Sequence, residues 1–349
     1  MQIKRKINVI ILGMAAAFAL SSCTPNQRNM DLIVSDVFCQ PICNDDSILG
    51  APNALALSDS ILAIVDTQSD SLIHIVNVGK QKYICKTGVL GQGPAEFTMI
   101  TSLNTSGNNS FCLYDPNKRT FYDMTCMMDT ASFSPLFRID SLMHYEVRPL
   151  ANHLYLATGI YEANRYCLVN SQGRIEKTFG EWPYRDEKEK NVSGRVKAQA
   201  YMGGITVNPS GTKFLSYVAT ADILSFYHLE KGEAHLVKEP CLTYPDYAYN
   251  DNSNSFRGTS REAPLTYLAA ASTEEYVYLL YSGKSTGKYD LNAFSGNMIY
   301  VYSWDGDKVA ELKSDKDLQC LCVSQDGKVI YTIASTPEPA LVQILLPEL

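Results

Sequence analysis

Residues 54–88 form the segment ALALSDSILAIVDTQSDSLIHIVNVGKQKYICKTG, from which the fold class can be predicted. It holds four short runs rich in Val, Ile, Leu and Tyr, and polar or glycine-containing turns separate each run from the next. Runs of this length with such turns between them are typical of β-strands. We therefore predict four consecutive antiparallel strands, at 54–58, 61–66, 71–77 and 82–88.

Similar groups of runs recur along the chain, and no long stretch has helical spacing of its apolar residues. Turns such as Pro209-Ser210-Gly211 and Asp305-Gly306-Asp307 contain glycine, which supplies the positive φ that tight hairpins need. The groups repeat at intervals of 46 to 64 residues, close to the period of four-stranded propeller blades. The sequence thus predicts an all-β, six-bladed β-propeller of four-stranded antiparallel blades, whose units open near Asn53, Met99, Glu146, Tyr201, Leu265 and Leu318.

The last unit contains only three runs, at 318–324, 328–335 and 340–346. The segment DLIVSDVF, Asp31 to Phe38, has strand character but no place in the first unit. We predict that this N-terminal strand is the fourth strand of the last blade, because ring closure removes the exposed edges of an open array. The propeller would then be a single domain over residues 31–349.

The N-terminus has the three parts of a signal peptide, predicted at residues 1–22. Lys4, Arg5 and Lys6 precede an apolar run, 7–20, that is too short for a stable membrane span. Leu20-Ser21-Ser22-Cys23 resembles the lipobox of bacterial lipoproteins, which implies lipidation of Cys23 and a tether over 23–30. An ordinary secretion signal with a chance cysteine is the alternative. Because Thr24 rather than Asp follows, and no acidic run, we expect an outer-membrane lipoprotein that faces the periplasm.

Composition excludes several classes of function. The net charge of −7 argues against nucleic acid as a partner, since a basic surface is needed to neutralise phosphates. The five histidines are scattered and form no zinc motif, so we predict no metal site, no cofactor and no catalytic residues. Nine cysteines follow Cys23, an odd number, and only Cys39 and Cys43 are close enough in sequence to suggest a local disulfide.

Two known propeller families resemble parts of this chain. VDTQSDSLIHIV, 65–76, followed by GVLGQGPAEF, 88–97, is similar to an NHL-type blade, although Ala95 replaces the last glycine of that pattern. YVYLLYSGK, 276–284, NMIYVYSWDGDKVAEL, 297–312, and the final VSQDGKVIYTIA resemble the TolB-like six-bladed propeller lipoproteins of the bacterial envelope. The resemblance implies six blades and a lipid anchor, and it brings no agreed catalytic residues.

The motif GKST within YSGKSTGKY, 281–289, does not predict a phosphate loop. Tyr278 stands where the first glycine should be, and the sequence predicts no helix after the motif. Ser285 likewise lacks the strand-to-helix turn of a nucleophile elbow.

The long segments predict where a ligand would bind. In a four-stranded meander, the blade-to-blade connections and the loops between second and third strands share one face, called here the connection face. Segments 180–197, 241–264 and 282–296 all belong to it, and the short glycine turns belong to the opposite turn face. Insertions gathered on one face of a repeat protein commonly mark its binding surface, although tolerated surface insertions would produce the same pattern. The candidate ligand contacts are Trp182, Tyr184, Arg185, Tyr247, Tyr249, Arg257 and Lys284.

Two functional hypotheses follow. The first is a lipid-anchored, non-catalytic propeller that binds an envelope protein, a peptide or a glycan, because no acid/base, nucleophile or metal-ligand set emerges. The alternative is a propeller hydrolase or lyase with a metal, such as calcium, held in the central channel by scattered carboxylates and amides.

Overall fold

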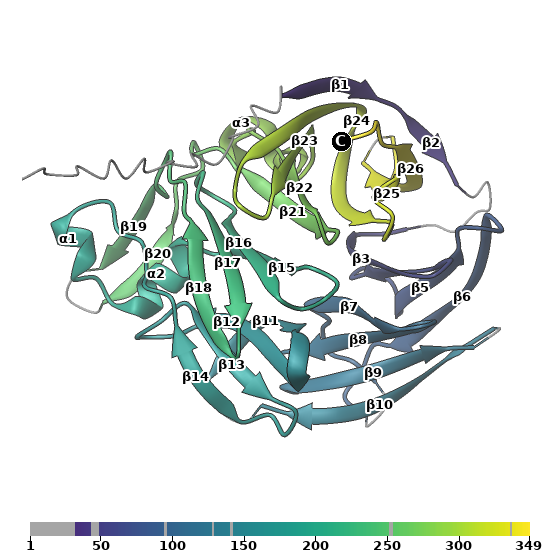
Figure 1. Ribbon diagram of the computed structural model, residues 1–349, viewed down its shortest axis with the longest axis horizontal. Coiled ribbons are helices and arrows are strands. Elements are labelled where there is room, and N and C mark those ends of the chain that lie inside the picture. The colour runs from purple at the N-terminus through teal and green to yellow at the C-terminus, as the bar shows by residue number, and fades with distance from the viewer. Residues whose placement is uncertain are drawn as a thin grey trace, which may run out of the picture. The chain divides into compact units, whose positions relative to one another are not determined.

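Strands dominate the structure, a computed structural model (Figure 1) that describes residues 32–42, 49–93, 96–127, 129–139, 142–250, 254–335 and 337–349. The predicted signal peptide, the tether with Cys23, and Cys43 lie outside these residues. Cys39 is described, and its thiol sulfur lies 3.3 Å from the Ser314 hydroxyl oxygen.

The first four blades are separate four-stranded antiparallel sheets, each an up-and-down meander in chain order. Their inner strands gather around the centre in Figure 1, and their outer strands lie toward the rim. The strands of these blades are β3 (Pro52–Ser58), β4 (Ile61–Asp66), β5 (Ser71–Asn77) and β6 (Lys82–Val89); β7 (Ser102–Gly107), β8 (Ser110–Asp115), β9 (Thr120–Cys126) and β10 (Ala131–Arg138); β11 (Met143–Pro149), β12 (Leu154–Ile160), β13 (Tyr166–Asn170) and β14 (Ile175–Phe179); and β15 (Gly203–Val207), β16 (Lys213–Val218), β17 (Leu224–Glu230) and β18 (Glu233–Lys238).

The fifth and sixth blades are joined through one long strand, β24 (Lys308–Val323). The first part of β24 is the outer strand of blade five, and its last residues, from Leu318, form the inner strand of blade six. The described residues therefore form six blades, as predicted. The remaining strands of the two blades are β21 (Tyr267–Ser272), β22 (Tyr276–Tyr281) and β23 (Gly296–Ser303) in blade five, and β25 (Val329–Ala334) and β26 (Ala340–Leu345) in blade six.

The predicted closing strand, 31–38, is not confirmed. Within it, β1 (Ile33–Val37) pairs in parallel with β24 at Ala310–Ser314, as an extra strand outside blade five. The next three residues, β2 (Cys39–Pro41), instead pair antiparallel with β26 in blade six. A parallel edge position leaves one side of β1 in solvent, and Val34 is 72% exposed. The alternating pattern of this segment therefore reflects an edge strand on the neighbouring blade.

Apolar packing between neighbouring blades forms the core. Separate clusters of buried side chains lie between blades one and two, two and three, three and four, four and five, and five and six. A further cluster joins blade six to blade one, with Cys320 and Cys322 packed beside Leu55 and Leu62. Neighbouring blades cover both faces of each blade. The middle strands therefore contain continuous apolar runs rather than an alternation of apolar and polar residues. The two cysteines act here as small buried apolar groups, as their strand context predicted.

Buried aspartates tie the entry of the chain into the first two blades. Asp66, at the end of β4, accepts hydrogen bonds from the backbone amides of Gly50, Ala51 and Gln68. Asp115, at the end of β8 in the second blade, accepts a hydrogen bond from the backbone amide of Thr98. A carboxylate can satisfy several buried donors at once, so these residues fix the blade-to-blade connections.

Short helices and strands interrupt several of the long loops. The connection between β14 and β15 contains α1 (Glu187–Lys190) and α2 (Gly194–Ala200). The connection between β18 and β21 contains a hairpin of β19 (Tyr247–Asn250) and β20 (Ser255–Thr259). The loop after β22 contains α3 (Thr286–Tyr289), where no helix was predicted, followed by the 3₁₀ turn η2 (Asp290–Phe294); a second 3₁₀ turn, η1 (Ala151–His153), precedes β12.

Candidate functional site

Two connections that are far apart in sequence meet on the connection face. Helix α2 packs against β20, and partly buried Trp182, Tyr247 and Phe256 pack against a small core around Tyr201. We call the residues Trp182, Tyr184, Arg185, Glu189, Tyr201, Tyr247 and Tyr249 the loop cluster. Five of the seven candidate contacts predicted from the sequence belong to it.

A buried carboxylate organises the loop cluster. Glu189 is only 3% exposed, and its backbone amide donates to the side chain of Asp186, which caps the N-terminus of α1. One carboxylate oxygen of Glu189 accepts the backbone amide of Arg185, and the other lies 3.9 Å from the Arg185 guanidinium. Burial raises the pKa of the Tyr201 and Tyr247 phenols, and the nearby Glu189 carboxylate raises both further. Both phenols therefore stay protonated, and their hydroxyl oxygens are buried near Glu189.

The exposed side of the loop cluster alternates cationic and aromatic groups. The Arg185 guanidinium lies 6.0 Å from the centre of the Tyr247 ring. The ring centres of Tyr247 and Tyr249 are 5.8 Å apart. The ammonium groups of two further residues, Lys188 and Lys190, lie over the rings of Tyr249 and Tyr184 at 5.9 and 5.3 Å. Such cation–π contacts hold long side chains in place and so present an ordered surface.

The two other candidate contacts, Arg257 and Lys284, have different positions on the connection face. Arg257 is exposed on β20, in the same hairpin as Tyr247. Lys284 belongs to a different loop, where its ammonium lies 2.6 Å from the Asp317 carboxylate, in the link between blades five and six, and its side chain is only 20% exposed. The structure therefore gives Lys284 an ion-pairing partner within the protein and does not bring it into the loop cluster.

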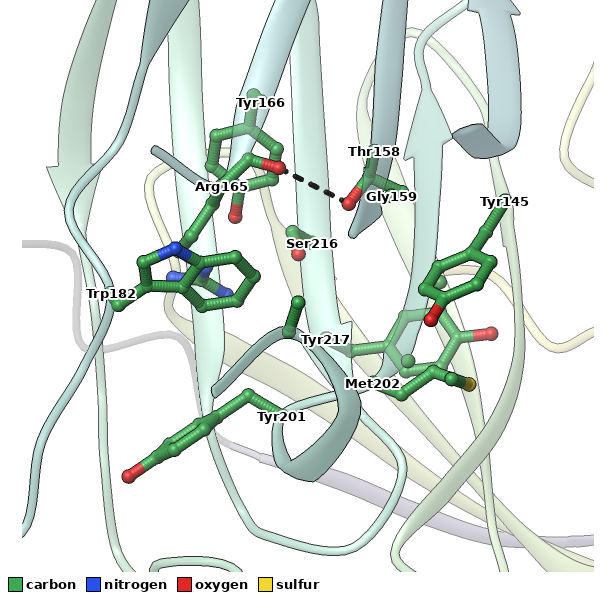
Figure 2. Close-up of a pocket in the computed structure, with 13 residues that line it drawn as sticks. Tyr145, Thr158, Gly159, Arg165, Tyr166, Trp182, Tyr201, Met202, Ser216 and Tyr217 are labelled. Atoms are coloured by element: carbon green, nitrogen blue, oxygen red, sulfur yellow. Dashed lines mark hydrogen bonds between the residues drawn. The ribbon is translucent and has the colours of Figure 1, made fainter. Parts of the chain in front are cut away.

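Beneath Trp182 lies a small polar cavity of about 20 Å³ (Figure 2). Figure 2 shows Trp182 and Tyr201 on one side of it and Thr158 and Tyr145 on the other. The indole N–H of Trp182 is buried and has no partner among the described residues. A space of this size holds about one water molecule. The loop cluster thus offers a surface rather than a pocket for a small molecule.

A much larger cavity, of about 600 Å³, lies at the centre of the ring. The ends of the inner strands β3, β7, β11, β15, β21 and β24 line it, together with the turns that follow them, so it belongs to the turn face. Sequence reasoning placed no candidate residues there, because the cavity exists only once six distant strands have closed into a ring.

Glu189 was also missed, because EKEK at 187–190 looks like a solvated charge run. The available signal was Asp186 followed three residues later by Glu189, the spacing of a helix N-terminal capping box.

Among the described residues, no group of three or more His, Cys, Asp or Glu side chains is placed to hold a metal ion. The hypothesis of a hydrolase or lyase with a channel metal therefore has no candidate set of such ligands in the part of the chain that the structure describes. No helix among the same residues is long and apolar enough to cross a membrane.

A family model described as TolB-like 6-blade propeller-like matches residues 35–326. This chain belongs to that family. No curated protein matches the sequence. Among solved structures, it is similar to a protein from Bacteroides fragilis that is named as exported, with 11% identity and a TM-score of 0.56, over 90% of this chain and 98% of that one. It is also similar to regucalcin, a calcium-binding protein from Agrobacterium tumefaciens, with 10% identity and a TM-score of 0.54, over 90% and 95% of the two chains. At these identities the likenesses show the shared propeller fold.

Proposed function

We propose that this TolB-like propeller is a lipid-anchored envelope protein without catalytic activity, and that its loop cluster binds a protein partner. The anchor would be Cys23, after removal of residues 1–22 by the signal peptidase, and the outer membrane, facing the periplasm, would be its site. The propeller domain would act as a rigid platform, and the insertions from blades three to five would supply the contacts.

The observation that carries the proposal is the convergence of Arg, Tyr and Trp side chains from two separate connections. These three residue types dominate the binding energy of protein interfaces. Here the cation–π contacts and the buried Glu189 fix their positions before binding, which lowers the entropy that association costs. Tyr244 lies within electrostatic range of Glu189 and is 39% exposed, so it extends the surface.

A protein suits this surface better than a small molecule does. The enclosed space beneath Trp182 is about 20 Å³, whereas small-molecule pockets measure about 300–1,000 Å³. A partner must therefore gain its contacts across an open surface, as proteins do.

The test compares the wild type with an Arg185→Ala/Tyr249→Ala double variant. Each protein is used as bait to capture partners from solubilised envelope. Both side chains lie on the exposed side of the loop cluster, so the double variant should stay folded, which circular dichroism will check. Arg174→Ala is the matched control, because Arg174 is exposed in the turn between β13 and β14 on the turn face. We expect a protein that is captured by the wild type and the control but lost with the double variant. Recovery of the same proteins by all three would contradict the assignment.

A further inference from the structure

The central cavity on the turn face has walls without net charge in their interior. Among the described residues that line it, Arg148 is the cation deepest in it; its Nε lies 2.7 Å from Oε1 of Glu146, and its Nη1 lies 2.7 Å from Oδ1 of Asn104. The second oxygen of Glu146 accepts the backbone amide of Ile205 at 3.0 Å. Glu146 therefore balances the charge of Arg148, whose Nη1 also donates to the carbonyl of Leu103, so Arg148 does not make an anion site. Asp59 and His153, which also line the cavity, are exposed in turns at its mouth.

Most polar side chains of the wall are neutral hydroxyls and amides, among them Thr105, Ser106, Asn108, Asn208, Ser210 and Ser272. Several hydroxyls donate their hydrogen to the free edge of an inner strand. Thr105 donates to the carbonyl of Leu57 at 2.8 Å, and Ser272 donates to the carbonyl of Val207 at 2.9 Å. A hydroxyl whose hydrogen is committed in this way keeps its lone pairs as acceptors. The wall therefore suits a ligand that carries many O–H donors.

An aromatic side chain at the cavity is held in a fixed orientation. Tyr155 lines the cavity, and its ring packs edge-to-face with Phe121 at 5.0 Å and with Phe137 at 4.6 Å. A fixed aromatic ring beside neutral hydrogen-bonding groups matches a molecule with both apolar and hydroxyl-bearing faces. Pyranose sugars have both kinds of face.

We propose that the central cavity is a second binding site, and that it takes a short uncharged glycan. The volume of about 600 Å³ lies within the range of ligand pockets, at about 300–1,000 Å³. The neutral walls disfavour phosphorylated, acidic or amino sugars, because burial of an unpaired charge costs much more than burial of a hydroxyl. This site goes beyond the protein-binding role proposed above, and it uses the opposite face.

The experiment is calorimetric titration of the full chain in detergent with a panel of neutral di-, tri- and tetrasaccharides built from glucose, galactose, mannose and N-acetylglucosamine. Triglucosamine and trigalacturonate are the charged probes of similar size, and neutral tri- and tetrapeptides are a further arm. We expect at least one neutral glycan to bind about 10-fold tighter than any charged probe or peptide. Binding of none of the neutral glycans, or equal or tighter binding of a charged sugar or a peptide, would overturn the proposal.

Variants locate the binding. Ser106→Trp places a bulky ring at the cavity mouth and should weaken binding by about 10-fold or more. Thr105→Val removes one acceptor without changing the volume and should weaken it by about 3- to 10-fold. Ser134→Trp, at an exposed position of β10 outside the cavity, is the control and should bind as the wild type does. The loop-cluster variant Tyr249→Ala should also bind normally, so failure of one proposal is distinguishable from failure of the other. Unchanged binding by both cavity variants would place the glycan elsewhere and contradict the proposal.

Discussion

Replacement of Asp66 by Asn tests how the first blade is held together. The side chain of Asp66 is fully buried, with Oδ2 2.7 Å from the Gly50 amide nitrogen and Oδ1 2.8 Å and 3.0 Å from those of Ala51 and Gln68. An asparagine in the same position can keep its carbonyl oxygen on two of these amides. Its NH₂ group then faces the amide of Gly50, where two donors meet and one hydrogen bond is lost.

The loss of one hydrogen bond to a charged group corresponds to about 2–3 kcal/mol of unfolding free energy. In urea this should lower the unfolding midpoint by about 1 M. Intrinsic tryptophan fluorescence and circular dichroism provide the two probes. Asp305→Asn is the control, because Asp305 is exposed in a turn, and its unfolding free energy should change by less than about 0.5 kcal/mol. If Asp66→Asn unfolds at the same urea concentration as this control, the role assigned to the buried carboxylate is wrong.

The pH dependence provides a second readout of the same residue. Burial by itself raises the pKa of Asp66, but the amides of Ala51, Gly50 and Gln68, together with the nearby His74, outweigh it, so the pKa in the folded protein lies below its ordinary value of 3.8. The folded state therefore binds the Asp66 proton less readily than the unfolded state does. The stabilisation by Asp66 is fully present above pH 3.8 and is lost as the pH falls through the lower folded value. The difference between wild type and Asp66→Asn should shrink over that acid range; a difference that grows there would contradict the sign.

Three other changes test separate parts of the account. Cys23→Ser should release the protein from the membrane fraction without loss of its β-sheet circular dichroism, and a variant that still pellets in high salt would disprove lipidation. Deletion of residues 39–41 should expose the edge of β26 and cause aggregation, measured by light scattering; a monodisperse product would show that β2 is dispensable. Trp304→Phe should cost about 2 kcal/mol, because the indole is buried and donates a hydrogen bond to a backbone carbonyl at 3.1 Å. Trp182→Phe should cost much less, and equal losses of urea stability in the two variants would refute that distinction.

The sequence predicts the ring of blades well because each blade is a local meander with its own turns. Four strand runs and their turns suffice to recognise one blade. The repetition of this pattern along the chain then predicts the number of blades. The unit predicted to open near Asn53 begins at Pro52, and Leu318 does begin the inner part of blade six. The prediction put the N-terminal strand on the wrong blade. The periodicity of residues 31–38 indicates a strand, but it fits the edge of one blade as well as the edge of another. Whether that edge belongs to β24 or β26 depends on tertiary contacts that periodicity does not encode.

The candidate site was predictable only in part. The aromatic and arginine content of 180–197 and 241–264 pointed to the segments that form the loop cluster. The burial of Glu189 was not predictable from composition, because its environment is made by Tyr201 and Tyr247 from other parts of the chain. Lys284 shares the connection face by topology but pairs with Asp317 instead. Strand order thus predicts the face of the propeller, whereas side-chain contacts decide which residues on it act together.

Site-specific photo-crosslinking in cells can show whether the loop cluster is the partner-binding surface. A photoreactive amino acid is introduced in place of Tyr249, and in a second strain in place of Arg174 on the turn face. We predict a discrete crosslinked protein from position 249, absent from position 174, that disappears when Arg185→Ala is added to the first strain. Crosslinking of the same protein from position 174 but not from position 249, or no crosslink from position 249, would contradict the account.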